Sequence, residues 1–243
     1  MEYLFLFAGP GVAICLYFFY KDIYNKEPRL NLLVSFLLGA AAIYPAILLE
    51  QSFGGKVIDG SVNGVALLAY LVVAFSEEGS KFLGFRLYSY NQKSFDEPFD
   101  GIVYAVMVSM GFATAENIKY LIESDPGSEL KLGLLRMITA VPAHANFAIV
   151  MGYFAGKAKF DPKNRTALLM AGFICATAFH GTYDFFLFLP RYSFVGMGAA
   201  NQYLAYGGFV SFIVSIVLCR KLIRRHRNLS REMFKPTNTT TSV

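Results

Sequence analysis

The sequence is poor in the charged residues and cysteines on which many soluble or secreted proteins depend. Only 16% of its 243 residues are charged, whereas 55% are hydrophobic and the mean hydropathy is +0.45. A soluble domain of this size needs far more charge on its surface. The three cysteines, Cys15, Cys175 and Cys219, are odd in number and form no CxxC pair, so no disulfide framework is expected.

The sequence also lacks the pattern of a secretory signal peptide and any nucleic-acid-binding motif, which narrows the class of protein further. Met1 and Glu2 lead directly into an apolar segment without a basic n-region, which argues against a cleaved secretory signal. No nucleic-acid-binding motif accompanies the net charge of +5. A basic C-terminal end beside an anionic lipid leaflet explains that charge more simply, so no nucleic-acid partner is expected.

Long apolar segments are what the sequence has instead, each near the roughly 20 residues that a helix needs to cross the hydrocarbon core. They predict an all-α polytopic membrane protein with seven transmembrane helices near residues 3–20, 31–50, 63–88, 101–121, 133–155, 166–189 and 202–223. A short re-entrant piece around 190–200 would raise the number to eight. Residues 1–225 then form a single transmembrane domain, and residues 226–243 form a basic, polar, disordered cytoplasmic tail.

The distribution of Lys and Arg predicts the orientation, because cytoplasmic loops collect positive charge. With the N-terminus outside, the loops around 20–30, 86–99 and 157–165 and the C-terminal end hold three, two, four and seven such residues, sixteen in all. The outer loops hold four, namely Lys56, Lys119, Lys131 and Arg191. We therefore expect the N-terminus outside and the C-terminus in the cytoplasm.

Polar clusters interrupt four consecutive apolar spans, where ionisable groups are costly unless they face a cavity or a partner. They read "SEEGSK" in the third span, "GFATAEN" in the fourth, "VPAHANF" in the fifth and "FHGTYD" in the sixth. A lone intramembrane histidine is most often an interhelical hydrogen bonder, and a single Glu–Lys pair can be a structural clamp. Their coincidence on four neighbouring spans favours one shared functional site.

Spacing within the clusters is helical. Glu77 and Lys81 are four residues apart, as are His180 and Asp184, so each pair shares a helix face. A lysine one turn away stabilises the charged form of a neighbouring glutamate. Asp184 is placed to hold one ring nitrogen of His180 and leave the other free to bind a metal or polarise water.

Depth in the membrane fits only some of these residues. Glu116, His144, His180 and Asp184 all fall at compatible depth, from the middle of the membrane toward its outer side. The adjacent pair at 77–78 lies on a helix that runs inward and falls closer to the cytoplasm. For the pair to join the others, the third span must begin well outside the hydrocarbon or be strongly tilted.

Together the motifs resemble those of the PrsW family of bacterial intramembrane proteases, a relative of the CAAX-prenyl endopeptidases and bacteriocin-processing proteins. The resemblance covers about residues 75–185, which would hold the catalytic core. It rests on a His in the fifth span and on the motifs Glu77-Glu78-x-x-Lys81, Phe112-x-x-x-Glu116-Asn117 and His180-x-x-x-Asp184. Four motifs in this order are more specific than any one of them.

The resemblance implies an activity, a location and a partner. It implies a multi-pass protease of the bacterial cytoplasmic membrane that performs site-1 cleavage of a single-span substrate at or near the outer face. The expected substrate is an anti-sigma factor, whose cleavage starts the release of a stress sigma factor. The family is treated as metal-dependent.

Because the resemblance implies a metal-dependent protease, zinc is the expected cofactor. Glu116, His144 and His180 would hold it, with a fourth position open for water. Glu77 would then be the general base and Glu78 would assist it. The three remaining residues would support them: Lys81 would keep the acidic pair charged, Asn117 would donate to the oxyanion, and Asp184 would orient His180.

Three alternatives remain open at this point. Glu77 and a histidine could activate water without a metal, as in the CAAX relatives. A proton- or ion-coupled transporter also gathers ionisable groups within the membrane, although it usually shows broken helices or inverted repeats. A non-catalytic scaffold would use polar groups for helix packing, but it would not need adjacent glutamates.

Overall fold

The computed structural model describes residues 3–192 and 200–235, and these form helices and connecting loops without a strand. The elements are α1 (Leu4–Lys21), α2 (Arg29–Ala41), α3 (Ile43–Val57), α4 (Val62–Leu67), the π-helix η1 (Leu68–Ala74), α5 (Phe75–Leu87), the 3-10 turn η2 (Ser89–Asn91), α6 (Asp100–Glu123), α7 (Glu129–Ile138), α8 (Ala140–Phe160), α9 (Arg165–Tyr192) and α10 (Ala200–Met233).

Seven segments of the described chain are long and apolar enough to cross a membrane, which confirms the predicted class and number of spans. They are Leu4–Lys21, Arg29–Val57, Val62–Asn91, Asp100–Glu123, Glu129–Phe160, Arg165–Tyr192 and Tyr206–Met233. The orientation of the chain stays a prediction. The re-entrant piece expected around 190–200 falls mostly on residues 193–199, which lie outside the described residues.

Helix α6 is the centre of the bundle, and it packs against α1, α2 and α8. All its residues from 100 to 114 are buried. Glycines allow the closest approach, because a Cβ added at Gly101 would lie 2.4 Å from the carbonyl oxygen of Gly152 on α8. Small residues that let backbones approach are a common device for packing helices in membranes.

Two of the spans are broken where a proline follows. The second span turns at Ala42, and Pro45 in the first turn of α3 cannot donate the backbone hydrogen bond that would continue α2. The fifth span is interrupted at Thr139, three residues before Pro142. This second break separates the short α7 from α8, so the two halves of the span can hold side chains at different angles.

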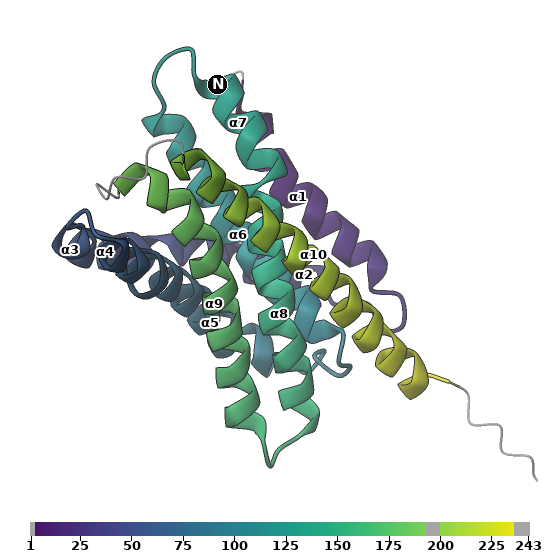
Figure 1. Ribbon diagram of the computed structural model, residues 1–243. Helices are drawn as coiled ribbons and strands as arrows, with labels where there is room; N and C mark the ends of the chain where they lie inside the picture. The colour runs from purple at the N-terminus through teal and green to yellow at the C-terminus, as the bar shows by residue number, and fades with distance from the viewer. Residues whose placement is uncertain (1–2, 193–199, 236–243) are drawn as a thin grey trace, which may run out of the picture.

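The third span runs obliquely, which resolves the conflict in depth noted from the sequence. In Figure 1 the hairpin of α3 and α4 projects to one side of the bundle formed by α6, α8 and α9, and α5 leads back toward its middle. The strong tilt allows the pair at 77–78 to reach the depth of the histidines. Within this span η1 packs against α9.

The C-terminal end corrects one expectation. Residues 226–233 were expected to belong to a disordered tail, but α10 continues to Met233. His226 and Ser230 are fully buried on this helix. The Ser230 hydroxyl accepts a hydrogen bond of 3.3 Å from the backbone N–H of Phe99. The helix persists because its last turns cover the loop that precedes α6.

Candidate active site

The acidic pair lies at the start of α5, directly after the π-helical turns of η1. Glu77 and Glu78 are both buried, and Lys81 on the next turn donates to each of them, at 3.1 and 2.8 Å. The same ammonium lies 3.1 Å from Nδ1 of His144 and 4.1 Å from the centre of the Phe112 ring. Lys81 therefore supplies the positive charge that two desolvated carboxylates require.

The two histidines come from neighbouring helices and face one another. His144 lies on α8 one turn after the Thr139 break, and His180 lies in the middle of α9. Their rings are 5.3 Å apart, and Phe147 stacks on the His180 ring at 4.8 Å. Nδ1 of His180 lies 2.9 Å from a carboxylate oxygen of Glu78, so α5 and α9 meet directly at the site.

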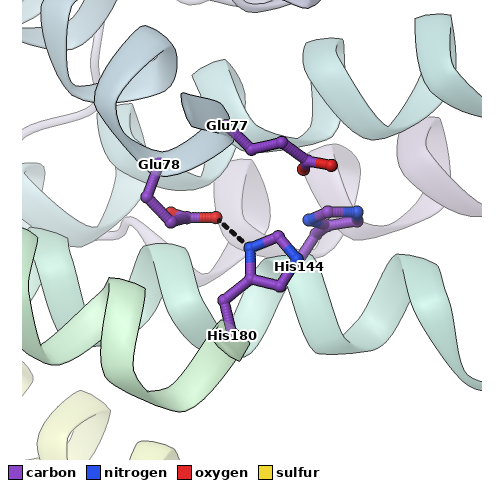
Figure 2. Close-up of side chains that lie close together, drawn as sticks. All are labelled: Glu77, Glu78, His144 and His180. Atoms are coloured by element: carbon purple, nitrogen blue, oxygen red, sulfur yellow. Dashed lines mark hydrogen bonds and ion pairs between the residues drawn. The ribbon is translucent and has the colours of Figure 1, made fainter. Parts of the chain in front are cut away.

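These four residues form a compact group whose ligand atoms lie close enough together to hold a metal ion. One ligand atom from each of Glu77, Glu78, His144 and His180 lies within 4.8 Å of every other, and all four side chains are buried. Figure 2 shows both carboxylates on α5 facing the two imidazoles. Imidazole nitrogen with carboxylate oxygen is a donor set found in catalytic zinc sites, so the residues present fit such an ion.

Glu116 stands behind His144 and outside that group of four. One of its oxygens lies 3.0 Å from Nε2 of His144 and accepts from Arg136 at 2.7 Å. Its expected role as a metal ligand stays a prediction. In the structure its contacts instead join the imidazole to a cation on α7 and fix the orientation of the ring.

Asn117 is fully buried, and both ends of its amide are engaged. Its Nδ2 donates to the carbonyl of Phe7 on α1 at 2.9 Å, and its Oδ1 accepts from Nε of Arg136 at 2.6 Å. Stabilising an oxyanion would require the bond to Phe7 to break. The oxyanion role stays a prediction, and the geometry assigns Asn117 to holding α1 and α7 against α6.

Asp184 lies one turn from His180, and its carboxylate is 3.2 Å from Nε2 of that ring. Since Glu78 contacts the other ring nitrogen, both nitrogens of His180 are engaged by carboxylates. The predicted orienting role of Asp184 agrees with this distance. A metal ion bound to either nitrogen would take the place of one of the two contacts.

A cavity of about 460 Å³ reaches this group. The predicted site residues that line it are Glu77, Glu116, His144, His180 and Asp184. Glu78, Lys81 and Asn117 are buried and do not line it. The lining continues to Lys119 and Arg191 near the ends of α6 and α9, so the cavity follows the bundle toward one end of these helices.

Two cavity residues were missed from the sequence. Arg136 is the only Lys or Arg within the expected span 133–155, and a cation in an apolar span signals a buried partner. Glu50 marks the end of the second expected span, and its carboxylate accepts from the Ser76 hydroxyl at 3.4 Å. Both line the cavity.

The helical membrane fold and the buried glutamate–histidine group together indicate a membrane-embedded hydrolase of the metal-binding type. The sequence comparisons identify the family. The model of the PrsW family, described as intramembrane metalloproteases, matches residues 27–219. The chain belongs to this family. It is therefore an intramembrane protease, and its fold is that of a multi-span membrane protein.

Several relatives named protease PrsW resemble the chain over most of their length. The relative from Geobacillus kaustophilus is 38% identical over 180 residues, which are 74% of this chain and 77% of the relative. The relative from Bacillus subtilis is 36% identical, covering 74% and 79%. The relative from Clostridioides difficile is 35% identical over 190 residues, covering 76% and 79%. No solved structure matches the chain.

Proposed function

We propose that the protein cleaves a single-span membrane protein near the outer face of the bacterial cytoplasmic membrane, in a reaction in which Glu77 activates water. The observation that supports this most strongly is the position of Glu77. Glu77 lines the cavity and faces two imidazoles, whereas its neighbour Glu78 is buried and does not line the cavity. We propose an anti-sigma factor as the substrate, on the basis of the family motifs.

Zinc is the proposed cofactor. His144 and His180 would hold it with a carboxylate from the group of four, and Glu78 suits this role because it contacts His180 and leaves its second oxygen unpartnered. Glu116, the ligand expected from the sequence, would then support His144. A bound zinc ion polarises a carbonyl oxygen and lowers the pKa of water, so that a nucleophile is available at neutral pH.

The protein side chains supply the remaining functions. Glu77 accepts a proton from the attacking water as a general base, and its protonated form then donates that proton to the leaving amine as a general acid. Lys81 holds the two carboxylates of the pair close together despite their like charge. Asp184 orients the His180 ring, and Arg136 fixes Glu116 against His144.

The cavity explains how water and a substrate segment would reach the site. Its lining runs from the histidines to Lys119 and Arg191, and in the predicted orientation those helix ends face outward. An extended segment of a single-span substrate entering from that side would reach Glu77 through this cavity. Cleavage near the outer face is the expected result.

The test is cleavage of a co-expressed single-span substrate by matched variants. Glu77→Gln keeps the shape of the side chain and removes the base, so we expect a 10²–10⁴-fold loss of cleavage in a folded protein. Glu123→Gln is the matched control, because Glu123 is exposed and lies outside both the cavity and the group of four. It should keep most of the activity.

Other outcomes identify the alternative functions. A transporter would give no cleavage by the wild type, and a scaffold would give His180→Ala protein that misfolds instead of a folded, inactive protein. Metal analysis of the purified proteins separates the ligand assignments. Glu78→Gln should lose bound zinc, whereas Glu116→Gln should keep it at reduced affinity. The reverse pattern would restore the assignment made from the sequence.

A further inference from the structure

A second group of buried carboxylates lies far from the cavity, where the loops after α1 and before α6 meet. Asp22 follows α1, Glu27 precedes α2, Glu97 precedes α6, and Asp100 begins α6. None of the four is more than 2% exposed. Asp100 and Glu116 are sixteen residues apart on one helix, a rise of about 24 Å along its axis, so this group lies well away from the active site.

Three of the carboxylates use one oxygen to hold the loops in place. One oxygen of Asp22 accepts from the backbone N–H of Glu27 at 3.0 Å. One oxygen of Asp100 accepts from the backbone N–H of Asp96 and of Glu97, at 2.9 and 2.8 Å. One oxygen of Glu27 accepts from the hydroxyl of Tyr104. The loops thus fix where these carboxylates point.

The remaining oxygens have no hydrogen-bond partner. They are Oδ1 of Asp22, Oε1 of Glu27, Oδ1 of Asp100 and both oxygens of Glu97, all inaccessible to solvent. Within the part of the chain that the structure describes, no Lys, Arg or His lies in ion-pair contact with any of the four. Burying a carboxylate oxygen without a partner costs a large desolvation free energy, so buried carboxylate oxygens in native proteins nearly always have a hydrogen-bond partner.

Three of the four carboxylates converge. One oxygen each from Asp22, Glu97 and Asp100 lies within 4.8 Å of the other two. Glu97 is the most informative member, because it is fully buried, neither of its oxygens has a donor within hydrogen-bond distance, and it faces the other two carboxylates. Burial and the negative charge of Asp22 raise the pKa of Glu97 to about 8, so the site favours a gain of positive charge.

We propose that these four carboxylates, Asp22, Glu27, Glu97 and Asp100, form an acidic loop cluster that binds a hard divalent cation, Mg²⁺ or Ca²⁺. The cation would join the loop after the first span to the loop before the fourth. The donors are carboxylate oxygens, the ligands that these ions prefer, and the cluster offers neither the imidazole nor the thiolate that favours zinc. The cation would balance charge that no residue of the cluster balances. This inference is independent of the proposed protease mechanism.

The test is cation binding to the full-length protein in detergent. Thermal unfolding of the wild type is followed after chelation and after addition of Mg²⁺ or Ca²⁺, and Mn²⁺ binding is followed by electron paramagnetic resonance. At a cation concentration a hundred times the dissociation constant, the midpoint should rise by about 5–10 °C. Glu97→Gln should abolish that rise and the corresponding Mn²⁺ signal.

Controls keep the outcome decisive. Glu123→Gln makes the same substitution at an exposed position and should behave as the wild type does. Asp22→Asn is the second cluster variant and should also lose the response, which covers the case in which Glu97→Gln does not fold. Cleavage of the substrate is measured separately, so failure of the protease proposal would not be confused with failure of this one.

Two results would overturn the proposal. The first is a wild-type protein that shows neither a cation-dependent midpoint nor bound Mn²⁺ at millimolar concentration, which would mean that the carboxyl groups share protons instead. The second is a cation response that survives both Glu97→Gln and Asp22→Asn, which would place the ion elsewhere in the protein.

Discussion

The active site and the acidic loop cluster are both groups of buried carboxylates, but they balance their charge in different ways. In the active site, Glu77 and Glu78 share the ammonium of Lys81, and Glu116 pairs with Arg136. In the loop cluster, the four carboxylates have no such partner among the described residues. The first site contains its own cations, whereas the second depends on protons or on an ion from solution.

This difference shows that neutralising a buried carboxylate can raise or lower the stability of the folded protein, depending on the charges around it. Breaking a buried ion pair leaves a charge without compensation and is strongly destabilising. Removing one carboxylate from a group of unpaired carboxylates relieves repulsion and desolvation. Neutralising one charge should therefore destabilise the active site and, when cations are absent, stabilise the loop cluster.

The largest effect is expected for Lys81→Met, which removes the cation from the active site and keeps most of the side-chain volume. Lys81, Glu77 and Glu78 are at most 7% exposed, so we expect a loss of about 3–5 kcal/mol in stability together with loss of cleavage. Unfolding of the purified protein in detergent measures the first. A variant as stable as the wild type would show that Glu77 and Glu78 share a proton and do not depend on the charge of Lys81. The active site and the acidic loop cluster would then balance their charge in the same way.

Asp184→Asn should have the next largest effect, and on metal binding more than on folding. The asparagine keeps the shape but no longer holds Nε2 of His180 with a charge, so metal affinity should fall by about 10–100-fold. Metal titration and cleavage measured on the same preparation test this. Asp161→Asn, on the exposed loop after α8, is the control. Unchanged affinity would show that Asp184 has no part in orienting the ring.

Arg136→Lys should have a smaller effect, because the positive charge is kept. Arginine contacts Glu116 and Asn117 through two different nitrogens, and a lysine cannot make both contacts in that geometry. We expect a loss of about 1–2 kcal/mol in stability, and cleavage should fall while the metal stays bound. Wild-type cleavage by Arg136→Lys would show that charge alone is sufficient at this position.

The smallest effect is expected at an exposed ion pair on the same helix as Glu116. Lys119 and Glu123 are 36% and 54% exposed and pair at 2.8 Å. Lys119→Ala should change stability by less than about 0.5 kcal/mol, as exposed pairs on helices do. A loss comparable to that of Lys81→Met would contradict the view that burial sets the importance of a charge in this protein.

Much of the fold was predictable because the lipid environment leaves few choices. Each apolar span must satisfy its own backbone hydrogen bonds, so length and hydropathy locate seven helices. The helical end at 226–233 was not predictable from composition. Those residues are polar, yet they stay helical because Ser230 contacts the loop before α6. That contact is distant in the sequence and leaves no local signal.

The members of the active site were also predictable, but their arrangement was not. Spacing of four residues placed Lys81 with Glu77 and Asp184 with His180, and both pairs are in contact. The position of Glu116 depends on Arg136, which comes from another helix, α7, just before the break in the fifth span. Contacts between helices are set by tilt and by breaks, and the sequence pattern reports neither directly.

The π-helix that precedes the acidic pair has a consequence for how this motif can change. Its seven residues, Leu68–Ala74, wind more loosely than an α-helix, and they set the rotational phase at which α5 begins. Deleting one of them would turn everything after it by about 100°. The letters "EEGSK" would survive such a deletion intact, yet they would point into lipid or packing instead of toward the imidazoles, so an unchanged motif does not guarantee a working enzyme.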